Sequence, residues 1–108
     1  MNNTILIGRT TKDIELKYTS SNIAYCKFTL AVNRKFKNSD GEYETDFIQC
    51  IAWKHSAEFM SKYVNKGNQI AVEGRIQTGS YDDNDGKRVY TTDVVVESVQ
   101  SLEKKSSG

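Results

Sequence analysis

The sequence predicts an all-β fold: a five-stranded Greek-key barrel with one short helix between its third and fourth strands. Three observations support this prediction. Five segments are rich in apolar residues, and most of them alternate apolar with polar positions, which is the period of a strand with one buried face. Two Asp-Gly pairs separate neighbouring segments, and such pairs favour hairpin turns. One segment with helical spacing follows the third strand.

The strands are expected at residues 4–7, 25–36, 43–53, 69–79 and 88–99. Three of them place their apolar residues on one parity, namely Cys26, Phe28, Leu30 and Val32, then Ile48, Cys50 and Ala52, then Ile70, Val72, Gly74 and Ile76. The last strand contains three consecutive valines at 94–96. One face of these strands is therefore expected to line a shared core.

The hairpin turns are expected at two positions. Asp40-Gly41 joins the second and third strands, and Asp85-Gly86 joins the last two. Asp and Gly both tolerate the positive φ that a tight hairpin turn requires, so each pair is expected to form the turn itself.

The helix is expected between Ser56, as its N-terminal cap, and Gly67, as its C-terminal stop. Its apolar face is expected to plug the barrel and consists of Ala57, Phe59, Met60, Tyr63 and Val64. An antiparallel sheet of five strands with one helix at this place indicates the OB-fold barrel, and closing the barrel removes exposed strand edges.

The length of 108 residues allows one domain, expected over residues 1–102. Residues 103–108 are expected to form a frayed polar end. Cys26 and Cys50 lie far apart and form no CxxC pair. Free thiols in a cytoplasmic protein are therefore the favoured interpretation, with a structural disulfide as the alternative.

The net charge of +1 indicates no particular partner, but the charges are unevenly distributed. Residues 1–37 carry an excess of five positive charges, whereas residues 38–50 carry four acidic residues and no basic one. A small domain polarised in this way can steer a polyanion. An ordinary solvated surface is the alternative.

Aromatic residues occupy unexpected positions. On the third strand the core parity is already filled, yet Phe47 and Trp53 lie on the opposite parity. Phe36 and Tyr81 each precede a hairpin turn by a few residues and are expected near the base of a long β-finger. Rings on a face that should be solvated contact either another protein surface or a ligand.

Basic residues stand beside these rings along the chain, including Lys35 next to Phe36 and Lys54 next to Trp53. Unpaired bases stack on aromatic rings whatever their identity, and their phosphates attract cations. A duplex hides its base faces and is read through its grooves. The combination therefore predicts sequence-independent binding of a single-stranded nucleic acid.

Three alternatives remain at this point. The rings could be core or oligomer contacts, or the barrel could bind proteins alone. It could also be a metal-dependent nuclease, although the acidic residues cluster at turns and not on a shared strand face. His55 is the only histidine, and no nucleophile, phosphate-binding loop or metal motif accompanies it. The sequence thus predicts no enzyme activity, no cofactor and no metal site.

The chain closely resembles the bacterial and phage single-stranded DNA-binding proteins over about residues 3–102. The similarity is carried by segments in family order and spacing, at residues 5–9, 12–18, 28–34, 66–67, 72–75 and 90–94. The resemblance implies an OB-fold homotetramer that wraps single-stranded DNA and protects it during replication, recombination and repair. The family also recruits replication and repair proteins through an acidic C-terminal tail, and residues 1–108 contain no such segment.

The resemblance assigns roles to twelve residues. The positions that match the family's base-stacking rings are Phe36, Phe47, Trp53 and Tyr81. The candidates for backbone contacts are Arg9, Lys17, Tyr18, Arg34, Lys35, Lys54, Arg75 and Arg88. Well-known members have Trp at three of the four ring positions, where this chain has Phe36, Phe47 and Tyr81. Smaller rings stack less area, so a lower affinity per site is expected.

Overall fold

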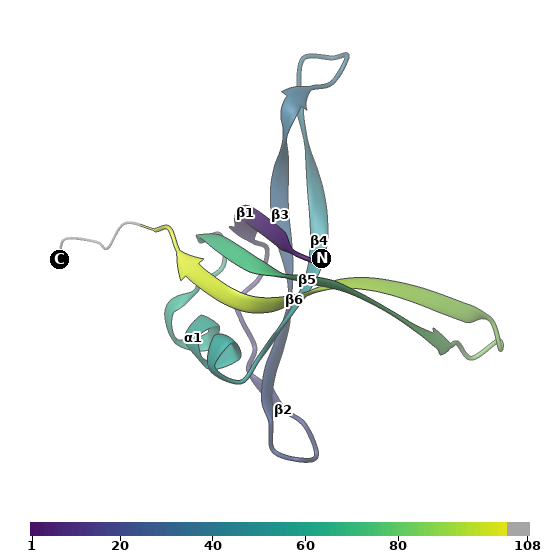
Figure 1. Cartoon of the computed structure of the whole chain (residues 1–108). Coiled ribbons are helices and arrows are strands. Elements are labelled where there is room, and N and C mark those ends of the chain that lie inside the picture. Colours follow the sequence, from purple (N-terminus) through teal and green to yellow (C-terminus); the bar gives the residue numbers. More distant parts are fainter. Residues whose placement is uncertain (104–108) are drawn as a thin grey trace.

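The computed structural model describes residues 1–103 and contains six strands and one helix (Figure 1). The elements are β1 (Thr4–Thr10), β2 (Lys17–Tyr18), β3 (Ala24–Lys37), β4 (Tyr43–Trp53), α1 (His55–Tyr63), β5 (Gln69–Asp82) and β6 (Arg88–Ser101). All strands but β2 correspond to the five expected from the sequence. The two-residue β2, which pairs with β3, was not predicted.

The five long strands close into a barrel. Their order is β1-β5-β6-β4-β3, and pairing of Arg9 and Thr10 with Ala31 and Leu30 joins β3 back to β1. The helix lies between β4 and β5 in the chain. The predicted OB-fold is thus confirmed. One detail was wrong, because the sheet is not antiparallel throughout: β4 and β6 run parallel where Cys50 pairs with Val94.

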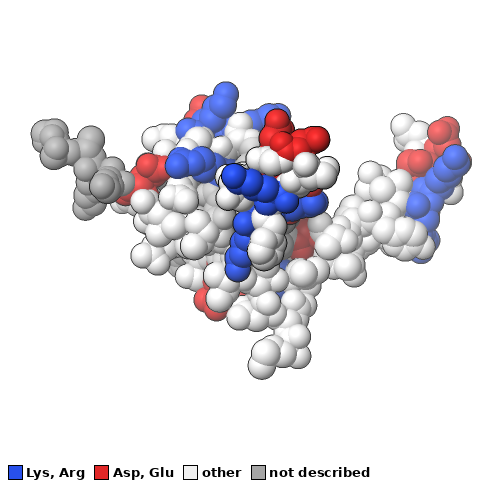
Figure 2. Space-filling model, turned by 90° about the horizontal axis from the view of Figure 1, so that it is seen from above, with Lys and Arg blue, Asp and Glu red and all other residues white. Residues whose placement is uncertain are grey.

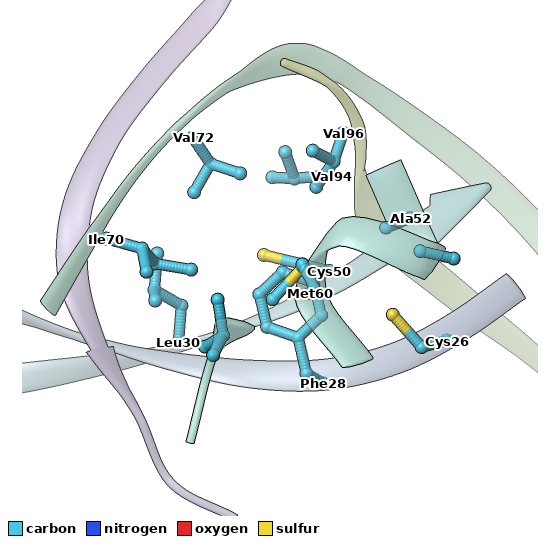
Figure 3. Close-up of a cluster of buried hydrophobic side chains, with 12 residues drawn as sticks. Cys26, Phe28, Leu30, Cys50, Ala52, Met60, Ile70, Val72, Val94 and Val96 are labelled. Carbon is cyan, nitrogen blue, oxygen red and sulfur yellow. The ribbon is translucent and has the colours of Figure 1, made fainter. Parts of the chain in front are cut away.

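The core lies inside this barrel (Figure 3). The predicted inward parity is confirmed for β3 and β4, and the apolar residues of β5 are buried as far as Gly74. Met60 of α1 is fully buried among them and plugs the barrel. Cys26 and Cys50 are free thiols on the inner face. Burial raises the pKa of Cys26 to about 11 and that of Cys50 to about 12.

Both predicted ends of the helix were wrong. Ser56 lies inside the first turn and does not cap it; the cap position is Lys54, whose backbone has φ 54°. The helix ends at Tyr63 because Val64 adopts an extended backbone and is buried in the core. Gly67, with φ 82°, belongs to the following turn, where its N–H donates to the carbonyl of Thr10.

Two long hairpins project from the barrel as fingers (Figure 1). The β3–β4 finger turns at residues 38–42 and the β5–β6 finger at residues 83–87. In each turn the side chain of the first residue, Asn38 or Asp83, accepts two backbone N–H bonds. Positive φ falls on Gly41 and Gly86 alone and not on the preceding Asp. The turns are therefore in the predicted places but are three-residue loops.

Candidate nucleic-acid interface

The outer face of the β3–β4 pair carries two of the four predicted rings. Phe47 is 65% exposed, and its register partner is the small Ala31, which leaves one side of the ring uncovered. Trp53 is 37% exposed and lies beside its register partner Tyr25, with ring centroids 5.3 Å apart. The parity argument made from the sequence is confirmed, since both rings point away from the barrel core.

The other two predicted rings lie on the fingers. Phe36 is 82% exposed, two residues before the turn that begins at Asn38. Tyr81 is 57% exposed and pairs with Val89, also two residues before its turn. The prediction that these rings lie near the finger bases was wrong: they lie near the tips. The reason is that each finger is long: eight exposed residues of β5 follow Gly74, whereas only two positions separate each ring from its turn.

The two rings on β4 each border a hollow in the surface. Phe47 lines one of about 390 Å³ together with Ile7, Arg9 and Ala31. Trp53 lines another of about 150 Å³, whose wall also includes Lys27 and side chains of the β5–β6 finger. Each hollow therefore combines an open ring face with a basic side chain. That is what a stacked base with a nearby phosphate requires.

Arg34 is already engaged by carboxylates across its own finger. Its guanidinium donates to both carboxylate oxygens of Asp46, with a closest contact of 3.0 Å, and to Glu44. The hydrogen bond from Arg34 is the main reason that the pKa of Asp46 is lowered. Part of the acidic run that the sequence placed at residues 38–50 is thereby neutralised, so Arg34 can reach a phosphate only by giving up these partners.

The remaining predicted cations fall into two groups. Arg9 contacts Glu103 at 3.3 Å, and Arg88 contacts Asp82 at 3.4 Å. The other four predicted cations make no ion pair within residues 1–103, namely Lys17, Lys35, Lys54 and Arg75. Figure 2 looks down on the β3–β4 finger and shows Lys and Arg side chains around it. A second group of basic residues lies beside acidic residues at the tip of the β5–β6 finger.

The comparison with known proteins agrees with this geometry. The model of the "Single-strand binding protein family" matches residues 1–102. The chain belongs to this family. It is 56% identical to the "Single-stranded DNA-binding protein 1" of Streptococcus pyogenes, over 99% of this chain and 82% of the relative. It is 55% identical to the "Single-stranded DNA-binding protein 3" of Listeria innocua, over 100% of this chain and 68% of the relative.

Three further exposed rings were not singled out from the sequence, and they are relevant because the chain belongs to this family. Tyr25 lies on the outer parity of β3, next to Trp53. Tyr90, on β6, and Tyr43, on β4, are exposed on the fingers. The alternation of β3 alone could have placed Tyr25 outside the barrel. Its contact with Trp53 depends on the β3–β4 register, which the sequence does not reveal.

The predicted polar end begins with a residue that is bonded to the barrel. Glu103 accepts a hydrogen bond from the backbone N–H of Gln69 at 2.6 Å and contacts Arg9. The rest of that end, residues 104–108, lies outside the described residues.

No helix within residues 1–103 is long and apolar enough to cross a membrane. Over the same residues, no three His, Cys, Asp or Glu side chains gather into a group that could hold a metal ion.

Proposed function

We propose that this protein binds single-stranded DNA without regard to sequence and protects it during replication, recombination and repair. The observation that carries the proposal is the outward placement of Phe47 and Trp53 beside hollows that also contain Arg9 and Lys27. Relatives named as single-stranded DNA-binding proteins support the binding of single-stranded DNA. In this proposal the protein binds DNA without catalysing a reaction, and it is located in the cytoplasm together with the DNA.

Two kinds of contact contribute to the binding free energy. Bases stack on the open rings of Phe36, Phe47, Trp53 and Tyr81, each contributing about 1–3 kcal/mol whichever base it is. The backbone passes along cations, and the release of counterions from its phosphates makes the affinity fall with salt. Lys17, Lys35, Lys54 and Arg75, with Tyr18, are the proposed backbone contacts that carry no ion pair within residues 1–103. Arg9, Arg34 and Arg88 can contribute only after releasing a carboxylate.

We also propose that the protein acts as a homotetramer. On β1, Ile5 and Ile7 point away from the core and are exposed. Two isoleucines on one strand face form an apolar strip that a second copy can cover. No recruitment of replication or repair proteins is proposed for residues 1–108, since the resemblance assigns that role to an acidic tail.

Titration with oligothymidine tests the proposed function. Trp53 is the only tryptophan, so its fluorescence reports directly on one proposed stacking site. We expect saturable quenching by oligothymidine, a linear fall of log K with log salt concentration, and little response to duplex DNA of the same length. A module that binds only proteins would give no saturable signal. Cleavage of the oligonucleotide with Mg²⁺, in proportion to added protein, would instead support the nuclease.

A further inference from the structure

A ring pair terminates the outer face of the β3–β4 ribbon. Tyr25 and Trp53 are register partners on adjacent strands, with centroids 5.3 Å apart and ring planes inclined by 35°. The backbone N–H of Lys54 donates to the carbonyl of Ala24 at 2.7 Å, which fastens the strands directly beside the pair. The two rings therefore lie side by side and form one platform.

The platform separates two hollows of similar size. On the Trp53 side, the hollow of about 150 Å³ lies against the β5–β6 finger and includes Gln77, Thr91 and Asp93. On the Tyr25 side, a hollow of about 140 Å³ is lined by Glu15, Lys17 and Lys27. Lys27 lines both hollows. Each volume exceeds the roughly 30 Å³ of one water several-fold, so each hollow can take part of a larger ligand.

The two hollows differ in their chemistry. The one beside Trp53 offers hydroxyl, amide and carboxylate groups with a single lysine, so its charges balance. Such a mixture of donors and acceptors suits the edge of a base. The one beside Tyr25 has two lysines against one glutamate. Its net positive charge suits a phosphate.

A purely structural ring pair exists elsewhere in the molecule for comparison. Phe59 and Tyr63, one helical turn apart on α1, have centroids 5.1 Å apart, and Phe59 packs against the core. Neither ring lines any of the three hollows beside Phe47, Trp53 and Tyr25. The pair at Tyr25 and Trp53 differs because it has a hollow and a lysine on each side.

We propose that Tyr25 is a further nucleotide-binding residue, which extends the Trp53 stacking site into a two-ring platform crossed by the strand. One base stacks at Trp53 with its edge in the hollow beside the β5–β6 finger. The next base of the strand stacks on Tyr25, and its phosphate lies between Lys17 and Lys27. This inference rests on the proposed binding of single-stranded DNA and names a contact within it.

The test compares Tyr25→Leu with Tyr63→Leu, which removes the same side chain from the structural pair. Affinity for oligothymidine is measured by fluorescence anisotropy of a labelled strand. We expect Tyr25→Leu to weaken binding about 5- to 150-fold, the range that corresponds to one stacked base. Tyr63→Leu should bind like the wild type, and Tyr25→Phe should bind nearly as well because it keeps the ring.

Cross-linking of the wild-type chain provides a measurement that does not depend on any variant folding. Oligothymidine carrying 5-iodouracil is irradiated in the complex, and the modified peptides are identified by mass spectrometry. Cross-links at both Tyr25 and Trp53 support the platform, whereas cross-links that include Trp53 and omit Tyr25 overturn it. Wild-type affinity retained by Tyr25→Leu, while the wild type itself binds, also overturns this inference and leaves the proposed function standing. A wild type that binds no oligothymidine overturns both.

Discussion

The two faces of the β3–β4 ribbon have opposite relations to water although they alternate along the same strands. On the inner face Leu30 and Ala52 are completely buried. On the outer face the side chain of Phe47 is 65% exposed and that of Trp53 is 37% exposed. Burial explains the apolar character of the inner face and leaves that of the outer face without a stabilising role. The comparison teaches that fold stability and ligand binding are assigned to alternate residues of one segment.

The largest expected effect lies on the inner face. Leu30→Ala should lower the free energy of unfolding by about 2–5 kcal/mol, since it removes a fully buried side chain and leaves a cavity. Urea denaturation measures this loss. Gln49→Ala, on the exposed outer face of β4, is the matched control and should change stability by only about 0.5 kcal/mol. Equal losses in the two variants would mean that the faces do not differ energetically.

The outer-face rings should show the reverse behaviour. Phe47→Ala and Trp53→Ala should each weaken oligothymidine binding by about 1–3 kcal/mol, because each removes a stacking surface. Their unfolding free energies should change far less than that of Leu30→Ala, since both rings are already partly in water. Binding is followed by anisotropy and stability by urea denaturation. If Phe47→Ala keeps wild-type affinity and loses stability instead, its ring is a structural contact.

The thiols on the inner face predict a fall in stability at high pH. Burial raises the pKa of Cys26 and of Cys50 from 9.0 to about 11 and 12. Their contribution is therefore fully present below pH 9 and is lost as the pH rises from 9 toward those values, because only the unfolded state ionises there. The loss should reach about 1 kcal/mol per thiol at pH 10.

Unfolding in urea at pH 8, 9 and 10 measures this dependence. Cys26→Ala/Cys50→Ala is the control, because it removes both thiols and keeps the other titrating groups. Its stability should decline less steeply between pH 8 and 10 than that of the wild type. Parallel declines would show that the thiols are not shielded from ionisation by the barrel.

The division between the two faces could be predicted from the sequence because strand alternation is a local property. Cys50 and Ile51 are neighbours in the chain, and their parity alone assigns one to the core. The parallel contact of Cys50 with Val94 could not be predicted in this way. It joins residues more than forty positions apart and depends on how the whole barrel closes.

The same distinction explains what was missed at the candidate site. Phe47 and Trp53 were found by parity, whereas the contact of Tyr25 with Trp53 depends on the register between two strands. The carboxylates that hold Arg34 lie on the opposite strand of the finger. The helix ended early because burying Val64 in the core outweighed the local preference for a stop at Gly67.

The smallest expected effect is a difference in the salt dependence of binding between substitutions of two basic residues on the outer surface. Lys54 makes no ion pair within residues 1–103, whereas Arg34 is held by Asp46 and Glu44. Lys54→Gln should therefore reduce the slope of log K against log salt by about 0.7, the value for one phosphate contact on a single strand. Arg34→Gln should leave the slope nearly unchanged, because its charge is already neutralised within the protein.

Titrations with oligothymidine at four or more salt concentrations measure both slopes. A slope reduced by about 0.7 in Arg34→Gln would mean that DNA displaces Asp46 and Glu44 from the guanidinium. The ion pair would then be a contact of the free protein that the strand replaces on binding.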